Sequence, residues 1–277
     1  MNEAPKGVFS SQRSAHNESP LAALPRRDLF LILASVAIIT ALAWLYLLQL
    51  DRQMAGPAAN MDAMMRMGMS MNMNWSASDV FFTFAMWAVM MVGMMGPSAT
   101  PMFLVFAGAQ ARRSHSSAAL SAGLFGLGYL AVWTAFSGLA ALLQWGLHGA
   151  TLISESMVVT SARLGGAVLI AAGAYQLSPW KNKCLVHCRS PLNFLVAHWR
   201  DGKAGAFRLG ASHGMYCLGC CWALMCVLFA VGIMNLIWVA ALAMAVLLEK
   251  IAPKGIWIAR ASGVALLAYG LKMMFRV

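Results

Sequence analysis

Charge is scarce in this chain of 277 residues: Asp and Glu together number 9, charged residues make up 10% of the chain, and 61% of it is hydrophobic. An ordinary soluble domain has about 25% charged residues, because a surface that faces water needs charge. This scarcity excludes a soluble globular protein. It also excludes a nucleic-acid-binding protein, since the Lys and Arg behind the net charge of +11 are too sparse to line a phosphate-binding surface. No phosphate-binding loop or ATPase motif is present, so any transport would be passive or coupled to a partner.

Long apolar runs are abundant instead, and several reach the roughly 20 residues that a helix needs to cross a bilayer. They predict an all-α, polytopic membrane helix bundle of about seven transmembrane helices. The predicted helices cover 29–49, 79–107, 118–145, 158–177, 209–231, 234–249 and 256–275. We expect the second to kink or break near Pro97 and Pro101, because proline removes a helical hydrogen bond.

Composition divides the chain into four parts. These are a disordered cytoplasmic tail (1–28), a first transmembrane anchor (29–50), a Met-rich outer loop (51–78) and a six-helix membrane domain (79–277), which includes a Cys- and His-containing cytoplasmic loop at 178–208. The first apolar run has a second interpretation as a signal peptide, with a cleavage region near 55–58. Its length favours a retained anchor.

Lys and Arg alternate between the two sides of the predicted bundle. The N-terminal tail, the loop at 178–208 and the connections after 79–107 and 234–249 are basic, whereas the alternate connections are nearly free of Lys and Arg. Cytoplasmic connections carry the excess of Lys and Arg. We therefore predict a multi-pass protein of the bacterial inner membrane with a cytoplasmic N-terminus.

Methionine is concentrated in the outer loop, where seven of the 13 residues from Met61 to Met73 are Met. Polar residues separate them, so core packing does not explain the pattern. A Met-lined groove for a partner is one interpretation. The other is soft-metal capture, because thioethers select Cu(I) and do not form disulfides in an oxidising compartment. The predicted outer ligands are Met64, Met67, Met69, Met71 and Met73.

A second methionine pattern lies in the helix at 79–107. Met86, Met90 and Met94 are four residues apart and therefore share one face of a helix. Such a stripe is often ordinary packing. Because it follows the Met-rich loop directly, we predict that it forms a path of sulfur ligands that leads inward.

Cysteine is concentrated on the cytoplasmic side, in two clusters. The first contains Cys184 and Cys188, and the second contains Cys217, Cys220 and Cys221. Paired clusters of this kind resemble metal-ligand spacing, and the reducing cytoplasm disfavours structural disulfides. We expect the second cluster at the N-terminal end of its helix, where the helix dipole favours thiolate.

Three histidines accompany these cysteines: His187, His198 and His213. They are candidate ligands or groups that orient the ligands. Four thiolates with a histidine nearby would suit Zn²⁺, whereas two or three thiolates suit Cu(I). The Met-rich segment favours Cu(I), and Zn²⁺ is the alternative.

Glu249 follows a long apolar run and precedes Lys250. An acidic residue near membrane depth is a functional candidate. A salt bridge with Lys250 near the membrane interface explains it equally well.

Five motifs carry a family resemblance. They are MMVGMMGPS (90–98), YQLSP (175–179), KCLVHCRSP (183–191), HGMYCLGCCW (213–222) and LLEK (247–250). Over about 80–275 the chain resembles the predicted metal-binding integral membrane protein family catalogued as domain of unknown function 2182. The resemblance implies metal binding but no particular metal, because the Met-rich loop lies outside the pattern.

These features predict an integral membrane protein, not an enzyme, that binds Cu(I) and moves it from the outer Met-rich segment to a cytoplasmic-side Cys/His site. Expected partners are membrane lipid, the metal ion, and periplasmic and cytoplasmic metal-carrier proteins; a homo-oligomer is left open. Two alternatives stand beside this prediction. One is a membrane thiol-disulfide oxidoreductase, and the other is a non-transporting metallochaperone or assembly factor with a Zn or Cu site.

Overall fold

The structure, a computed structural model, describes residues 24–66, 75–113, 118–152 and 161–275. Within these ranges the chain forms helices and turns and no strand, which confirms the predicted all-α class. The helices are α2 (Arg26–Arg66), α3 (Ala77–Arg113), α4 (Ala118–Gly149), α5 (Ala162–Leu177), α6 (Pro179–Arg189), α7 (Pro191–His198), α8 (Gly202–Val231), α9 (Leu236–Ile251) and α10 (Gly255–Phe275).

Each of the seven predicted spans is a helix, but fewer than seven are long enough to cross a bilayer. Five helical segments are long and apolar enough in the described ranges: Arg26–Gln53, Ala77–Arg113, Ala118–Gly149, Gly202–Val231 and Gly255–Phe275. The other two, α5 and α9, have 16 residues each. At 1.5 Å per residue that is about 24 Å, less than the roughly 30 Å of a hydrocarbon core.

One local prediction is wrong: the first helix does not end near residue 50, because α2 continues to Arg66 through a stretch rich in helix-favouring Ala and Met. Of the predicted kink or break near Pro97 and Pro101, the break is absent, since α3 runs through both prolines. Hydroxyls of this region bond within the helix, from Ser98 Oγ to the Met95 carbonyl (2.9 Å) and from Thr100 Oγ1 to the Gly96 carbonyl (3.2 Å).

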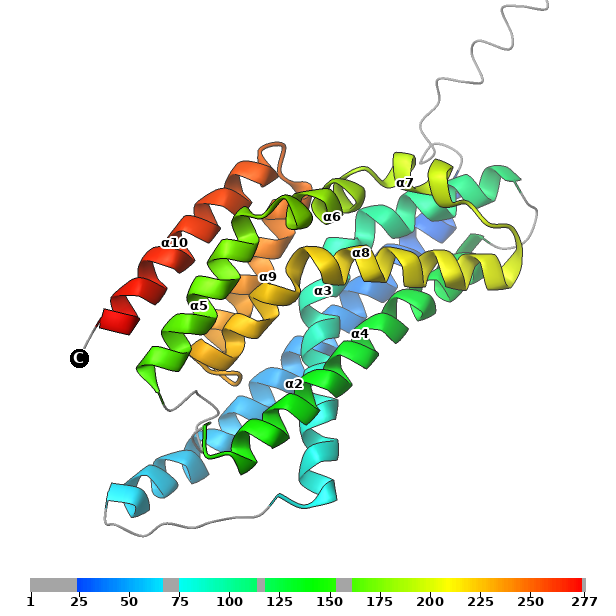
Figure 1. Cartoon of the computed structure of the whole chain (residues 1–277). Helices are drawn as coiled ribbons and strands as arrows, with labels where there is room; N and C mark the ends of the chain where they lie inside the picture. The colour runs from blue at the N-terminus through cyan, green and yellow to red at the C-terminus, as the bar shows by residue number, and fades with distance from the viewer. Residues whose placement is uncertain (1–23, 67–74, 114–117, 153–160, 276–277) are drawn as a thin grey trace, which may run out of the picture.

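The loop predicted at 178–208 folds largely into α6 and α7, which lie across one end of the bundle (top of Figure 1). Ser178 ends α5 and caps α6, and Pro179 occupies the first turn of α6, where its missing N–H costs nothing. Ser190 and Pro191 begin α7 in the same order, but the Ser190 side chain makes no capping hydrogen bond. Two Ser-Pro pairs therefore turn the chain sharply and place α6 over the bundle.

Glycines allow α4 and α8 to pack with their backbones in contact. A Cβ on Gly128 would lie 2.0 Å from the Phe207 carbonyl oxygen, and a Cβ on Gly210 would lie 1.9 Å from that of Phe125. Helices that approach this closely need small residues at the crossing. The contact holds α8 deep inside the bundle, and the side chains that follow Gly210 are correspondingly buried.

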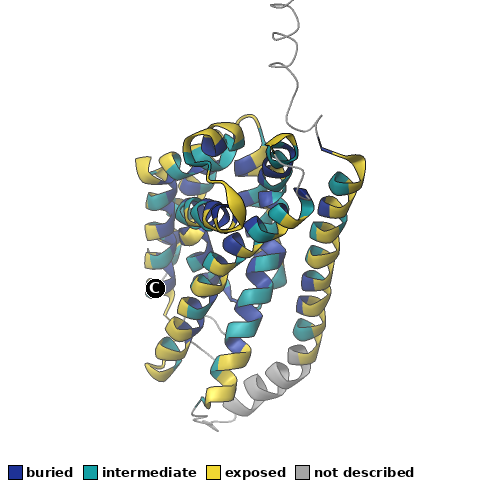
Figure 2. Cartoon of the chain, turned by 90° about the vertical axis from the view of Figure 1, so that its right-hand side faces the viewer, coloured by how far each residue is buried: buried dark blue, intermediate teal, exposed yellow. Residues whose placement is uncertain are grey.

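The helix α2 stands at the edge of the bundle, and most of its surface is exposed in Figure 2. It contacts α3 at Gly93, where a Cβ would lie 3.3 Å from the Ala43 Cβ, and at Gly96, where one would lie 3.3 Å from Thr40 Oγ1. The inner core contains the methionines of α3 and the cysteines of α8, and α2 contributes Leu47 to it.

We predict that Gly210→Ala destabilises the protein by about 1–3 kcal/mol, the usual cost of an overpacked core, because the new methyl group would meet helix backbone. The measurement is thermal unfolding in one detergent. The control is Gly146→Ala in α4, where a Cβ meets nothing within 4 Å. Equal melting temperatures for the two variants would contradict the proposed packing of α4 on α8.

Candidate metal centre

Three cysteines of α8 form the centre of the candidate site. Cys217, Cys220 and Cys221 share one helix face and are at most 2% exposed. The prediction that they lie at the N-terminal end of their helix is wrong, because α8 begins at Gly202. The helix dipole acts within the first turn, so another group has to stabilise thiolate here.

A lysine of α9 supplies positive charge next to these cysteines. Lys250 Nζ lies 3.0 Å from Cys217 Sγ and 3.0 Å from Ser98 Oγ. The Tyr129 hydroxyl lies 3.1 Å from the same sulfur. Lys250 is 8% exposed, and no carboxylate contacts it in the described part of the chain. An adjacent ammonium favours thiolate, so Lys250 would compensate the charge of a deprotonated Cys217.

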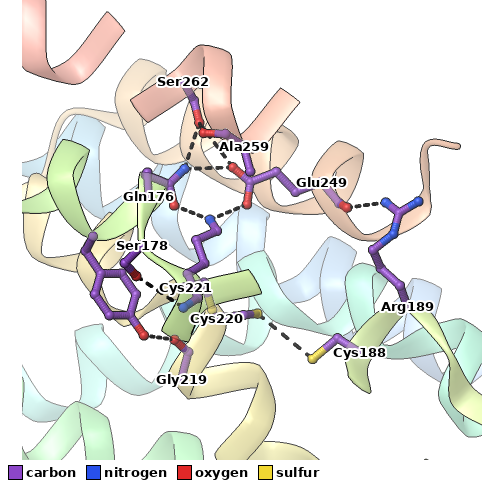
Figure 3. Close-up of polar contacts among 12 residues, drawn as sticks. Gln176, Ser178, Cys188, Arg189, Gly219, Cys220, Cys221, Glu249, Ala259 and Ser262 are labelled. Atoms are coloured by element: carbon purple, nitrogen blue, oxygen red, sulfur yellow. Dashed lines mark hydrogen bonds and ion pairs between the residues drawn. The ribbon is translucent and has the colours of Figure 1, made fainter. Parts of the chain in front are cut away.

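The helix α6 brings two more cysteines to α8. Cys188 Sγ lies 3.9 Å from Cys220 Sγ, and the two sulfurs point toward each other in Figure 3. All six cysteines are free thiols. A disulfide requires about 2.05 Å, whereas two sulfurs that share an ion at about 2.3 Å lie about 3.8 Å apart in tetrahedral geometry and about 4.0 Å apart in trigonal geometry. The observed separation excludes a disulfide and fits an ion shared in either geometry.

Cys184 lies one turn before Cys188, over the backbone of α8. A Cβ on Gly219 would lie 2.9 Å from Cys184 Sγ, so this glycine makes room for the sulfur. The Tyr175 hydroxyl donates to the Gly219 carbonyl at 2.5 Å. Desolvation raises the pKa of the Cys184 thiol. The hydrogen bond to Cys220, together with burial, raises the pKa of the Cys188 thiol. A metal ion that binds these sulfurs must displace their protons.

A methionine of α3 completes the sulfur contacts. The Cys221 sulfur lies 3.9 Å from Met95 Sδ, and its thiol donates to the closer Cys217 carbonyl at 2.9 Å. The predicted ladder of Met86, Met90 and Met94 is buried in the same core, each residue being at most 4% exposed. The sequence-based prediction included Met86, Met90 and Met94 but not Met95, whose sulfur contacts a cysteine. All four methionines lie on α3, so only the packing of α8 against α3 shows which of their sulfurs lies next to a thiol.

The three candidate histidines occupy two places. His213 lies in α8 one turn before Cys217, is 3% exposed, and its Nδ1 has no hydrogen-bond partner. Its ring stacks on that of Tyr129 with centroids 5.8 Å apart. His187 and His198 lie together near Tyr216, and no hydrogen bond or ring contact joins them to a cysteine in the described ranges.

A buried ion pair holds α6 in place. Lys181 Nζ lies 2.6 Å from Glu249 Oε2, and both side chains are almost fully buried. Gln176 donates to Glu249 at 2.8 Å and accepts from Lys181, and Ser262 donates to Glu249 at 3.2 Å (Figure 3). The suggested salt bridge between Glu249 and Lys250 is therefore wrong, since the two side chains of these neighbours bond to different partners.

Arg189 adds a second tie between α6 and α9. Its guanidinium donates to the Glu249 carbonyl at 2.6 Å and to the Pro253 carbonyl at 3.0 Å. Sequence reasoning counted both Lys181 and Arg189 as basic loop residues. The sequence spacing could have linked Lys181 to the cysteines, because residues 181, 184 and 188 lie on one face of a helix.

Some predicted ligands cannot be placed. Met67, Met69, Met71 and Met73 lie outside the described residues, and of Met64 only the backbone, within α2, is described. Residues 1–23 of the predicted tail also lie outside. Among the described residues, no group of three or more His, Cys, Asp or Glu is placed to hold a metal ion. The sulfur contacts are instead pairwise, Cys188 with Cys220 and Cys221 with Met95.

Comparison with known families links the chain to copper. A family model described as PpoB2, copper chaperone, matches residues 84–273. This range includes the sulfur cluster, by which we mean the side chains of Met95, Cys184, Cys188, Cys217, Cys220 and Cys221. The chain belongs to this copper chaperone family. The matched range nearly coincides with residues 80–275, over which the sequence resembles a predicted metal-binding membrane protein family. The matched family is described by copper, a metal that the resemblance did not specify. Neither a curated protein nor a solved structure gives a match.

We predict that Lys250→Met weakens Cu(I) binding by about tenfold or more, because hydrogen bonds to charged groups contribute about 1.5–3 kcal/mol. Chelator competition under anaerobic conditions measures this affinity. Lys254→Met, which removes the same charge from an exposed position on the loop after α9, should bind Cu(I) like the wild type. An unchanged affinity in Lys250→Met would show that this ammonium does not stabilise the bound thiolates.

Proposed function

We propose that this copper chaperone family member is an integral membrane protein that binds Cu(I) at the sulfur cluster between α3, α6 and α8. The observation that carries the proposal is the contact of Cys188 Sγ with Cys220 Sγ at 3.9 Å, beside a thiol-thioether contact between Cys221 and Met95. Soft sulfur ligands select Cu(I). Paired ligands suit an ion that accepts two or three donors better than one that needs four.

The Lys250 ammonium lies 3.0 Å from Cys217 Sγ, so it would compensate part of the negative charge that deprotonated cysteines bring into the site. Uncompensated charge is costly in a low-dielectric interior. The preference for Cu(I) over Zn²⁺ rests on the soft sulfur ligands and on the copper chaperone family.

We propose further that copper moves along α3 toward this cluster. The helix runs from Ala77 at the end opposite α6 to Arg113 at the end that α6 and α7 cover (Figure 1). Met86, Met90 and Met94 follow one another at steps of about 6 Å and are buried along this course. Thiolates bind Cu(I) more tightly than thioethers do. The affinity for copper would therefore rise from the methionines of α3 to the cysteines, which gives the movement a direction without nucleotide hydrolysis.

Basic residues support the sidedness of this path. Arg26 and Arg27 begin α2, and Arg112 and Arg113 end α3, at the end of the bundle where α6 lies (Figure 1). Under the positive-inside rule this end faces the cytoplasm. The protein would then reside in the inner membrane with a cytoplasmic N-terminus, in contact with lipid and with metal-carrier proteins on both sides.

A second candidate function is copper delivery without transport. The description of the family as copper chaperones favours it. A delivery protein would bind copper at the same cysteines and pass it to a client on one side of the membrane. The two functions differ in flux, because only a transporter moves copper across a sealed bilayer.

Cys188→Ser/Cys220→Ser should lose most of the copper that co-purifies with the protein under anaerobic conditions, because it removes both thiolates of the closest sulfur pair. Elemental analysis gives the metal content. Cys226→Ser is the matched control, since Cys226 lies on α8 outside the cluster and should keep wild-type copper. Copper retained by the double variant, zinc in place of copper, or a Cys188–Cys220 disulfide in the native protein would each contradict the proposal.

Replacing the outer methionines Met67, Met69, Met71 and Met73 by Leu should slow Cu(I) uptake into sealed proteoliposomes several-fold when copper is limiting, because the capture ligands are lost. The copper content of the cysteine site at saturating copper should stay unchanged. Met215→Leu/Met244→Leu, at two exposed positions away from the path, serves as the control. Copper binding with no flux in the wild type would favour the delivery function.

A further inference from the structure

Two histidines lie apart from the sulfur cluster, at the end of the bundle covered by α6 and α7. His187 is in the last turn of α6, and His198 is the last residue of α7. Both residues are half-buried. Their ring centroids are 6.5 Å apart, with an angle of 67° between the planes. The sequence grouped them with the cysteines, whereas the structure pairs them with each other.

The hydrogen bonds of the two imidazoles fix their tautomers. His187 Nδ1 lies 2.8 Å from the Lys183 carbonyl oxygen, and His198 Nδ1 lies 3.1 Å from that of Phe194. A carbonyl only accepts hydrogen bonds, so each Nδ1 carries a proton and each Nε2 of the neutral ring presents a lone pair. Metal-bound histidines commonly have this arrangement. Among the residues described, no group donates to either Nε2.

The separation of the ring centroids leaves space for one ion between the two imidazoles. With a metal–nitrogen bond of about 2.0 Å and about 1.1 Å from ring nitrogen to centroid, two imidazoles on opposite sides of an ion have centroids about 6.2 Å apart. The observed 6.5 Å is close to this value. Two opposed nitrogen ligands suit an ion of low coordination number such as Cu(I).

Aromatic rings hold both imidazoles in position. Tyr216 stacks on His187 with centroids 4.4 Å apart and planes at 7°. Phe194 stacks on His198 at 4.8 Å. Tyr216 directly precedes Cys217 in α8, and His187 directly precedes Cys188 in α6. His187 therefore shares α6 with Cys188 and stacks on a ring of α8 that adjoins Cys217, whereas His198 comes from α7.

We propose that His187 and His198 form a second copper site, at which Cu(I) is exchanged between the sulfur cluster and a carrier outside the bundle. The identity of the ion rests on the proposed function. Lys183, Arg189 and Arg200 surround the pair in sequence and make this end basic. A nearby positive charge repels a free divalent cation more than a monovalent one. It also favours a carrier with an acidic surface.

The test uses the full chain labelled with ¹⁵N-histidine and titrated anaerobically with the Cu(I)–acetonitrile complex. In the Cys188→Ser/Cys220→Ser background, we expect the side-chain resonances of His187 and His198 to shift together and to saturate with one ion. His198→Gln alone should leave the His187 resonance at its metal-free position, since one ligand of the pair is gone. The control is His148→Gln, in the last turn of α4, which should leave the shifts of His187 and His198 unchanged.

Resonances of His187 and His198 that stay in place as copper is added, in the wild type and in the cysteine variant, would overturn the proposal. So would a shift of His187 that persists in His198→Gln. Copper content measured on the same samples tests the sulfur cluster separately. Unshifted histidine resonances in a protein that still contains copper would refute the histidine site alone, whereas loss of copper from the wild type would refute the cysteine site.

Discussion

The buried ion pair between Lys181 and Glu249 is the interaction on which the candidate site depends. It joins α6 to α9 inside an apolar bundle, at 2.6 Å between Lys181 Nζ and Glu249 Oε2. Loss of one partner from such a pair leaves an uncompensated buried charge and costs about 3–5 kcal/mol. Because Gln176 and Ser262 also bond to Glu249, the carboxylate is well satisfied. The pair helps to fix α6 over α8, together with the hydrogen bonds of Arg189 to α9 and the Ser-Pro turns, and so brings Cys188 to Cys220.

Glu249 and Lys250 are neighbours with different tasks. Glu249 holds α6 through Lys181, and Lys250 extends to the cysteines of α8 and contacts Cys217 Sγ at 3.0 Å. One turn of α9 thus supplies both the anchor of the thiol-bearing helix and the positive charge beside the thiols. This coupling explains why an apolar helix ends in two ionisable residues that are both buried.

Much of this architecture could be predicted from sequence, because apolar runs reveal membrane-length helices directly. Helical spacing alone places Cys217 and Cys220 on one face of a helix, with Cys221 next to them. The contacts of Cys188 with Cys220 and of Met95 with Cys221 could not be predicted, since they depend on how α6 and α3 pack against α8. The role of Lys250 was missed because the adjacent acid offered a simpler partner. The outer methionines stay a prediction from sequence.

The most direct test of the central claim is X-ray absorption at the copper edge of the wild-type protein purified anaerobically. We predict an edge typical of Cu(I) and a first shell of two or three sulfur atoms at about 2.3 Å, with Cys188 and Cys220 among them. A first shell made only of nitrogen and oxygen, or zinc bound in place of copper, would contradict the claim that the sulfur cluster between α3, α6 and α8 is the copper site.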